Sequence, residues 1–401
     1  MGAVVGSRAA RRASGARMNE YHAGNRVQLL KCGAEYFPAL ERAMDAAVNE
    51  IRLETYIFAD DKTGRRIVDA MTRAVRRGVD VHVTYDGFGS SDFVGALDNM
   101  MREAGIKVAV FRPDAGWNRF RRARLRRLHR KLVTVDGRTA FVGGINIIDD
   151  LNMPSPKEPR FDYAVQVEGP LLAPIHDAMS ELWARLHSSS LGKSNETVTP
   201  VAPASDVAGD HHAWFGFRDN VSHRRDIERE YLIAILAAKV EVLIANAYFF
   251  PGRRFRRALM RARRRGVRVR LLLQGRQEYL LQHYATRALY GTLLEAGVEL
   301  YEYSPSFLHA KVAVVDGTWA TVGSSNIDPF SLLLAREANV FVRNAAFATE
   351  LRDSLNEAIK MSSTVIHAQR WSGRPLLDRV LTWALYGVAR GMMALLGYGR
   401  H

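Results

Sequence analysis

One segment of the chain occurs twice, and this repeat limits the folds open to it. HRKLVTVDGRTAFVGGIN (129–146) aligns without a gap to HAKVAVVDGTWATVGSSN (309–326), at an offset of 180 residues. Each copy contains the pattern His-x-Lys-x₄-Asp and closes with an asparagine. Two such copies in a chain of 401 residues predict two homologous halves, each long enough to bury its own core.

The repeat extends upstream of the motif. Each half has an apolar strand ending in an aromatic residue, a basic amphipathic helix closed by glycine, and a second strand. These segments are 51–58, 65–78 and 79–86 in the first half, and 242–250, 253–266 and 267–274 in the second. The alternation predicts two tandem α/β domains with mixed, largely parallel sheets flanked by helices. We expect a pseudo-two-fold axis between them, with the active site at their interface.

Shifts in composition predict the domain boundaries. We expect a basic flexible N-terminal tail, a first domain, a linker or surface excursion rich in Ser, Thr, Pro and Gly, a second domain, and a C-terminal tail with an amphipathic helix. Their ranges are 1–24, 25–187, 188–213, 214–360 and 361–401.

The charge balance favours a polyanionic partner. A net charge of +15 is typical of proteins that bind nucleic acid or an anionic membrane surface. The single cysteine, Cys32, excludes an internal disulfide framework and a cysteine-rich zinc site. With no stretch of 18 uncharged apolar residues, the sequence predicts no spanning helix.

The two motifs offer complementary parts of one phosphodiester site. Each half supplies one histidine, one lysine and one asparagine, which is an incomplete acid–base set. We therefore expect the halves to pool their motifs, so that one of His129 and His309 attacks phosphorus while the other protonates the leaving oxygen. The non-bridging phosphate oxygens would be bound by Lys131, Lys311, Asn146 and Asn326. Four such donors could replace a metal ion, and no Zn or Ca ligand spacing is present, so we predict neither metal nor cofactor.

Carboxylates are needed to orient the imidazoles. One candidate follows each motif at the head of a predicted strand, Asp162 and Glu337; the alternative is that both are surface carboxylates. The motif aspartates, Asp136 and Asp316, are grouped with the catalytic candidates. Each precedes a glycine at a strand end, so they could instead support turns and hold the lysines.

These motifs resemble those of the phospholipase D superfamily, and most closely those of the short bacterial cardiolipin synthases that lack N-terminal transmembrane helices. The flanking segments ETYIF, NAYFFP and DYAVQVEGP are also similar, so that the likeness covers about residues 25–345. One departure is Glu278, which stands where relatives usually carry Asp. The resemblance implies that the chain is a phosphatidyltransferase.

The same resemblance implies a role for each histidine. His129 would form a phosphatidyl-histidine intermediate, and His309 would act as general acid and then as base; the near symmetry of the motifs leaves the reverse assignment open. Phosphatidylglycerol would be the phosphatidyl donor and a second phosphatidylglycerol the acceptor, with release of glycerol. Water in place of the acceptor would give phospholipase activity.

Two basic stretches could attract phosphate. Residues 119–131 carry seven arginines around the first histidine, which suits either a phosphate-attracting rim or a solvated helix face. The arginines of 253–265 lie on a repeated helix and are more ambiguous between the same two interpretations. Several cations near an anionic surface would each contribute on the order of 1 kcal/mol to binding.

The tail predicts an interfacial helix. Residues 375–400 have an apolar face that carries Leu377, Leu381, Leu385, Val388, Met392 and Leu395, with Arg379 and Arg390 opposite and Trp383 and Tyr386 as anchors. The alternative is a helix docked on its own domain. With an interfacial helix, the protein would lie peripherally on the cytoplasmic face of the inner membrane, bound to anionic phospholipid.

Two other functions compete with lipid synthesis. The first is a phosphodiesterase or nuclease on the same scaffold, since the positive charge also suits nucleic acid. No basic stretch is interleaved with a row of stacking aromatics, however, so we expect no nucleic acid partner. The second is a non-catalytic membrane scaffold, against which the intact motifs argue. A monomer would suffice for catalysis.

Overall fold

The computed structural model describes residues 20–91, 94–113, 126–153, 158–188, 201–219, 223–278, 280–328 and 335–395. The first half contains, in chain order, β1 (His22–Lys31), α1 (Cys32–Ala46), β2 (Glu50–Thr55), α2 (Lys62–Arg76), β3 (Asp80–Asp86), α3 (Leu97–Glu103), β4 (Lys107–Phe111), β5 (Arg127–Leu128), β6 (Lys131–Val135), β7 (Thr139–Gly143), β8 (Tyr163–Glu168) and α4 (Leu172–Ser188).

The second half repeats this order with additions. It contains β9 (His211–Arg218), α5 (Asp226–Ala237), β10 (Glu241–Asn246), α6 (Arg253–Arg264), β11 (Arg268–Gln274), α7 (Leu280–Arg287), α8 (Tyr290–Glu295), β12 (Glu299–Tyr303), β13 (Lys311–Val315), β14 (Trp319–Gly323), β15 (Ala335–Arg343), α10 (Ala345–Ser362), β16 (Ser363–Ile366), α11 (Ala368–Ser372) and α12 (Leu376–Leu395).

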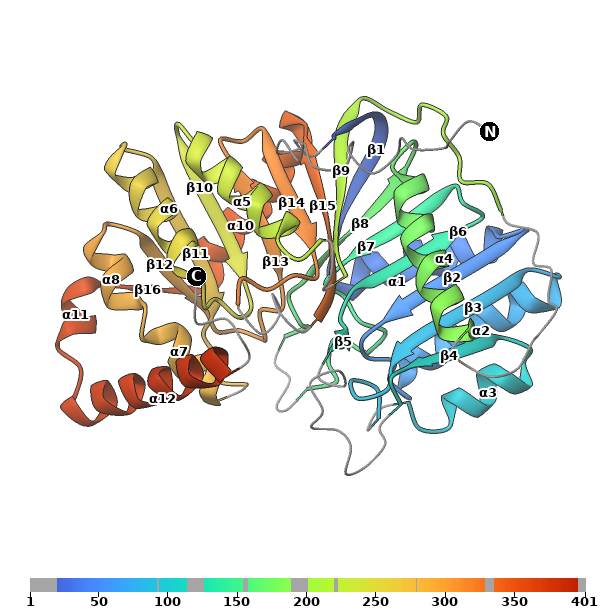
Figure 1. The fold of residues 1–401 in the computed structure, drawn as a ribbon, viewed down its shortest axis with the longest axis horizontal. Coiled ribbons are helices and arrows are strands. Elements are labelled where there is room, and N and C mark those ends of the chain that lie inside the picture. The colour runs from blue at the N-terminus through green and yellow to red at the C-terminus, as the bar shows by residue number, and fades with distance from the viewer. Residues whose placement is uncertain are drawn as a thin grey trace, which may run out of the picture.

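A single sheet runs through both halves, in the order β16-β12-β11-β10-β13-β14-β15-β9-β1-β8-β7-β6-β2-β3-β4. The halves meet where β1 pairs antiparallel with β9 (Figure 1). The repeat is visible on either side of this seam, because β1 is followed by β8, β7, β6 and β2, and β9 by β15, β14, β13 and β10. The fold is therefore mixed α/β, as predicted.

The expectation of a largely parallel sheet is wrong in its detail. Among the strands of the described residues, only β2-β3-β4, β10-β11-β12 and the short β5–β15 contact are parallel, and the other strand pairings are antiparallel. The reason is the motif itself. The strands on either side of each Asp-Gly pair are joined by a turn of a few residues, too short for the crossover that parallel strands require.

Those turns need left-handed backbone. φ is +52° at both Asp136 and Asp316, and +60° and +63° at the glycines that follow. Aspartate and glycine tolerate this region better than other residues do. The sequence Asp-Gly therefore fixes the hairpins β6–β7 and β13–β14, and with them the position of each motif.

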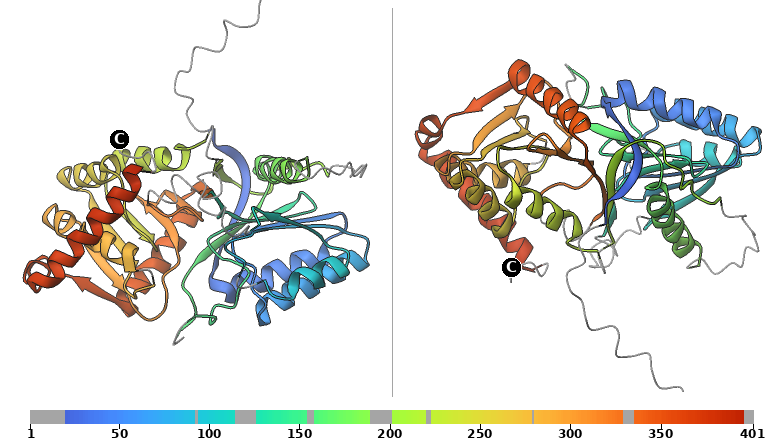
Figure 2. Two further views of the ribbon diagram at one scale, coloured as in Figure 1. Left: turned by 60° about the horizontal axis from the view of Figure 1, so that its bottom comes forward. Right: turned by 90° about the horizontal axis from the view of Figure 1, so that it is seen from above.

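Helices cover both faces of the sheet. In the first half, α1, α2 and α3 lie on one face and α4 on the other; in the second half, α5 and α6 lie opposite α10 (Figure 2). The predicted basic helices are amphipathic: α6 buries Phe255, Ala258, Leu259 and Ala262 and ends before Gly266, whose φ is +89°. Its arginines lie mostly on the outer side.

One hydrophobic core extends across the seam. It combines first-half residues such as Leu132, Val165 and Met179 with second-half residues such as Val312 and Leu351. Two further cores belong to the separate halves, beneath α1–α3 and beneath α5–α6. Because the central core is shared, we expect the halves to unfold together.

The sheet extends past the domain ranges expected from the sequence. β1 begins at His22, β9 begins at His211, and β16 pairs with β12 after residue 360. Residues 1–19 and 189–200, which contain most of the expected tail and part of the expected linker, lie outside the described residues. No helix in the described ranges is long and apolar enough to cross a membrane.

Candidate active site

The histidine and lysine of each motif lie at the start of a central strand. β6 begins at Lys131 and β13 at Lys311, each held between two antiparallel neighbours. Because side chains alternate along a strand, His129 and Lys131 face one way and Arg130 the other. Both lysines are buried, whereas His129 and His309 keep 17% and 15% of their side-chain surface exposed. Each imidazole therefore keeps part of its surface open to solvent.

Each histidine is anchored to the other half through its backbone. The N–H of His129 donates to the carbonyl of Arg336 at 2.9 Å, and the N–H of His309 donates to the carbonyl of Phe161 at 2.8 Å. In both cases the acceptor precedes a candidate carboxylate, Glu337 or Asp162. The two motifs are therefore brought to the interface by equivalent contacts, as the two-fold expectation requires.

The carboxylates pair crosswise with the histidines. Nδ1 of His129 lies 3.1 Å from Glu337, and Nδ1 of His309 lies 2.6 Å from Asp162. The sequence placed each carboxylate downstream of one motif; the structure pairs it with the histidine of the other. Both carboxylates are buried, and the contact at Nδ1 leaves Nε2 of each imidazole for chemistry.

Glu337 remains ionised. Burial raises the pKa of this carboxyl, but its contact with His129 and the nearby Arg218 and Lys131 together hold it below its ordinary value. The hydroxyl of Ser324 also donates to Glu337. An ionised Glu337 accepts Nδ1–H from His129, which leaves a lone pair on Nε2. Burial lowers the pKa of His129 and so keeps the imidazole neutral.

Asp162 differs from Glu337 in its ionisation. Burial raises its pKa to about 7, against the opposing charge of Lys311 and the hydrogen bond from the N–H of Tyr163. Burial, with the charge of Lys311, lowers the pKa of His309 well below its usual value. These two shifts favour a shared proton on the carboxyl side; with that proton donated to Nδ1, Nε2 of His309 would carry the imidazole hydrogen.

The lysines have lowered proton affinity. Burial reduces the pKa of Lys131 to about 7 and that of Lys311 to about 8. Each ammonium donates to the carbonyl of the histidine two residues before it, with Lys131 at 2.6 Å from that oxygen. A phosphodiester anion placed between them would favour their charged forms.

The two asparagines lie in equivalent positions. The side-chain oxygen of Asn146 accepts the N–H of Ile57 at 3.1 Å, and that of Asn326 accepts the N–H of Tyr248 at 3.4 Å. With the oxygen held by the backbone, the amide nitrogen of each side chain is the group available to donate. Both residues are buried beside their strands.

Asp136 and Asp316 do not belong to this cluster. They end the strands that begin at the lysines, roughly 16 Å away along an extended chain. Asp136 accepts three backbone N–H groups, those of residues 48–50, at 2.7–2.9 Å, and Asp316 accepts those of residues 239–241 at 2.8–2.9 Å. Their contacts support the turn-holding alternative, and neither aspartate holds a lysine.

The structure adds residues that the sequence did not single out. The ring of Tyr56 lies 4.8 Å from that of His129 and 5.4 Å from the ammonium of Lys131. Arg218, fully buried on β9, lies 4.0 Å from Glu337. Tyr56 lies in the repeated segment ETYIF, but only the folded arrangement places it or Arg218 beside the histidines.

The stretch 119–131 is only partly described. Residues 119–125 lie outside the described residues. Arg130 is buried and donates to Glu54 and to the carbonyl of Ala178, each at 2.9 Å, so it belongs to the core and not to a phosphate-attracting rim. Arg127 stacks on Phe88 with its guanidinium 4.3 Å from the ring centre. In the described ranges, no group of three or more His, Cys, Asp or Glu residues could hold a metal ion.

Known proteins share this sequence and fold. A family model described as the cardiolipin synthase, phospholipase D-like domain matches residues 40–181 and again residues 231–359. Cardiolipin synthase B of Escherichia coli (strain K12) is 39% identical over 363 residues, covering 87% of this chain and 85% of that protein, and cardiolipin synthase B of Shigella flexneri gives the same values. The crystal structure of phosphatidylserine synthase from Haemophilus influenzae Rd KW20 matches with a TM-score of 0.68 over 95% of this chain and 97% of that chain, at 13% identity, which is a likeness in fold alone.

Proposed function

This chain belongs to the phospholipase D superfamily as a member of the cardiolipin synthases, and from that membership we propose its reaction: transfer of a phosphatidyl group from phosphatidylglycerol to a second phospholipid, with release of glycerol. The observation that carries the proposal is the crosswise pairing of each motif histidine with a buried carboxylate of the other half. That pairing supplies two oriented imidazoles at one interface, which is what a two-step displacement at phosphorus requires.

In the first step, Nε2 of His129 attacks phosphorus. The bond from phosphorus to the glycerol oxygen breaks as His309 delivers its Nε2 hydrogen to that oxygen, while Asp162 passes its proton to Nδ1 of His309. The products are neutral glycerol and a phosphatidyl group bound to His129. The different ionisation of Glu337 and Asp162 supports this direction, because one histidine has a free lone pair and the other an acidic hydrogen.

In the second step, the roles reverse. Nε2 of His309 takes the proton from the hydroxyl of the acceptor lipid, and the proton on Nδ1 returns to Asp162. The acceptor oxygen forms its bond to phosphorus as the bond to His129 breaks. Lys131, Lys311 and the two motif asparagines would bind the non-bridging oxygens through both steps, so that no metal or other cofactor is needed.

The substrates lie in a bilayer, so the enzyme has to reach a membrane surface. We assign this contact to α12, which packs against α7, buries Thr382 and sets the ring of Tyr386 5.5 Å from that of Phe250, yet exposes Val380, Trp383 and Val388. One face of α12 is thus docked on the domain, as one expectation has it, and the other face is free for the membrane contact of the other expectation. The side chains at 376–379 and 392–395 lie outside the described residues. The net charge of +15 would favour anionic phospholipid, on the cytoplasmic face of the inner membrane.

The test is incubation of purified protein with labelled phosphatidylglycerol vesicles, with and without EDTA, followed by mass spectrometry of the products. We expect cardiolipin and glycerol in both buffers, and neither from His129→Ala. Phosphatidic acid as the only product would identify a hydrolase instead. Loss of activity with EDTA would contradict the metal-free mechanism.

A further inference from the structure

The two halves differ at one position beside the histidines. Phe58 bridges to Ile147 as Phe249 bridges to Ile327, and both asparagines accept a backbone N–H from the residue before those phenylalanines. This register makes Ile57 the counterpart of Tyr248. The counterpart of Tyr56 is therefore Ala247, although the segments ETYIF and NAYFF suggest that the two tyrosines correspond.

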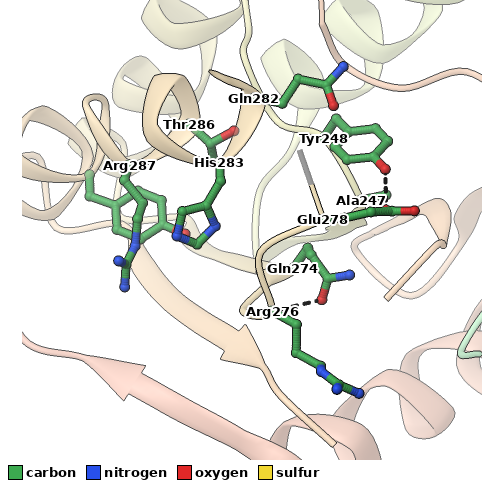
Figure 3. A pocket seen from close by; sticks show the side chains of 10 residues that line it. Ala247, Tyr248, Gln274, Arg276, Glu278, Gln282, His283, Thr286 and Arg287 are labelled. Atoms are coloured by element: carbon green, nitrogen blue, oxygen red, sulfur yellow. Dashed lines mark hydrogen bonds between the residues drawn. The ribbon is translucent and has the colours of Figure 1, made fainter. Parts of the chain in front are cut away.

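This difference leaves one side of the site covered and the other open. In the first half, the ring of Tyr56 packs on His129 and Lys131. In the second half, the methyl group of Ala247 cannot do this, and a shallow pocket open to solvent lies there instead (Figure 3). Its lining includes Ala247, Tyr248, Gln274, Arg276, Gln282 and Thr286.

The pocket adjoins His309. The side-chain oxygen of Gln274 accepts the N–H of Leu308 at 3.3 Å, and the N–H of Ala247 donates to the carbonyl of Ala310 at 2.9 Å. Two lining residues thus contact the residues immediately before and after His309. A group bound in the pocket would therefore lie on the side of the second motif, and not on that of the first.

The polar groups of the pocket suit a hydroxyl. Within the described part of the chain, the side-chain nitrogen of Gln274 and the side-chain oxygen of Gln282 are buried without a hydrogen-bond partner. Figure 3 shows Gln282 reaching in from α7 and Gln274 from the end of β11. A hydroxyl can accept from one amide and donate to the other, whereas an ammonium group can only donate.

The counterpart of Gln274 in the first half has different chemistry. Asp86 ends β3 as Gln274 ends β11, and its carboxylate accepts the N–H of Leu128 at 2.7 Å, as the Gln274 oxygen does at Leu308. Both side chains accept a backbone N–H just before the motif histidine, but only the amide of Gln274 also has an N–H group that it can donate. The carboxylate that lines the pocket, Glu278, accepts the hydroxyl of Tyr248.

From these observations we propose that the pocket binds the alcohol of the reaction, first the leaving glycerol and then the hydroxyl-bearing headgroup of the acceptor. This inference rests on the proposed function and deepens it. It places the alcohol on the side of His309, which agrees with the role of acid and base proposed for this histidine above. Gln274 and Gln282 are then specificity-determining residues.

Two variants test the pocket. Ala247→Tyr restores the covering side chain of the first half, and Gln282→Leu removes one hydrogen-bond acceptor; Gln28→Leu, at an exposed position on β1, is the matched control. Two readouts apply to each: exchange of labelled glycerol into phosphatidylglycerol, and the ratio of cardiolipin to phosphatidic acid. Circular dichroism and a thermal melt establish that each variant is folded.

We expect Gln282→Leu to lower both readouts about fivefold, the loss of roughly one neutral hydrogen bond. Ala247→Tyr should lower them further, with water favoured over the larger alcohols, and Gln28→Leu should match the wild type. Unchanged exchange and product ratio in folded pocket variants would overturn the inference. Wild-type protein that forms no cardiolipin would contradict the proposed function, and glycerol exchange would then test the pocket alone, because exchange requires no lipid acceptor.

Discussion

At the scale of single residues, the pKa values of two chemically similar carboxyl groups are shifted in opposite directions. Glu337 receives the hydroxyl of Ser324 and lies near Arg218, and both favour its anion. The counterpart of Ser324 is Gly144, where a Cβ atom would lie only 2.4 Å from Asp162. Asp162 thus has no hydroxyl at that position, and burial raises its pKa to about 7. In the proposed mechanism, this asymmetry distinguishes the nucleophilic histidine from the histidine that acts as acid.

Removing the charge of Glu337 should disable the nucleophile. In Glu337→Gln the side chain keeps its size, but it no longer favours the Nδ1–H tautomer of His129 or stabilises the positive charge that develops on the attacking ring. We expect kcat to fall on the order of 10²- to 10⁴-fold. Product formation from phosphatidylglycerol measures this. The control is Glu357→Gln, an exposed carboxylate on α10, and equal activity of the two variants would contradict the assignment.

The pH dependence should show a fall on the alkaline side. The pKa is about 7 for Lys131 and Asp162 and about 8 for Lys311, so raising the pH removes two phosphate-binding charges and the proton needed by His309. We expect kcat/KM, which reports the free enzyme, to decline above about pH 7. A soluble phosphodiester substrate avoids effects of pH on the bilayer. A value that still rises between pH 7 and 9 would be inconsistent with these groups.

At the scale of elements, each motif spans a strand whose two ends have different tasks. The lysine begins the strand at the site, and the aspartate ends it at a turn that holds the loop before β2 or β10. The His-x-Lys-x₄-Asp motif thus places site residues at one end of the strand and a residue that stabilises the fold at the other end. The substitution of either aspartate should separate these two effects.

Asp136→Ala should destabilise the protein without changing its chemistry. Three backbone N–H groups lose their acceptor, and alanine must adopt a φ of +52°. We expect about 1–3 kcal/mol less free energy of unfolding, with kcat of the folded protein within about twofold of wild type. Urea denaturation and specific activity measure the two quantities. Asp136→Asn, which keeps an acceptor oxygen and tolerates positive φ, should lose less stability.

The exposed face of α12 should set membrane affinity. Val388→Ser removes apolar surface that is 53% exposed, and Val48→Ser does the same at a loop position that is 71% exposed. If α12 enters the interface, the first substitution should weaken binding to anionic vesicles about tenfold, and the second should have no effect. Vesicle sedimentation measures this. Equal binding of both variants would remove α12 from the contact surface.

The sequence predicts elements and motif residues better than their pairing. Strand, turn and helix signals around His129 and His309 are local, and the site asparagines and carboxylates follow at recognisable positions. Which carboxylate serves which histidine depends on β5, β15 and the strands at the seam, which are contacts between distant parts of the chain. The inward orientation of Arg130 follows from strand alternation, and a count of arginines cannot reveal it.

At the scale of the whole molecule, the halves form one structural unit. The sheet is continuous through β9 and β1, and the central core takes side chains from both halves. Each half also completes the other's histidine. Separate motion of the halves would break both histidine–carboxylate pairs at once. The active site is therefore intact only while the two halves remain paired through β1 and β9.

A chain cut once between residues 189 and 200 should therefore stay together. The cut lies between α4 and β9 in sequence and leaves the β1–β9 pairing, the shared core and both histidine–carboxylate pairs intact. With a protease site inserted there, we expect the cleaved protein to elute from a sizing column as one species and to retain cardiolipin synthesis. Fragments that separate without denaturant would show that the seam is weaker than its contacts imply.

The crosswise pairs also bear on how a protein of this design can arise. A single half holds a histidine that lacks its carboxylate and a carboxylate that lacks its histidine. Two copies of that half, joined as β1 and β9 are joined, would satisfy both needs at once. A symmetric dimer of one half is thus a chemically complete ancestor, and fusion of its two genes would free each copy to change alone. The difference between Tyr56 and Ala247, which occupy equivalent positions, can exist only after fusion, because the two subunits of a symmetric dimer have identical sequences.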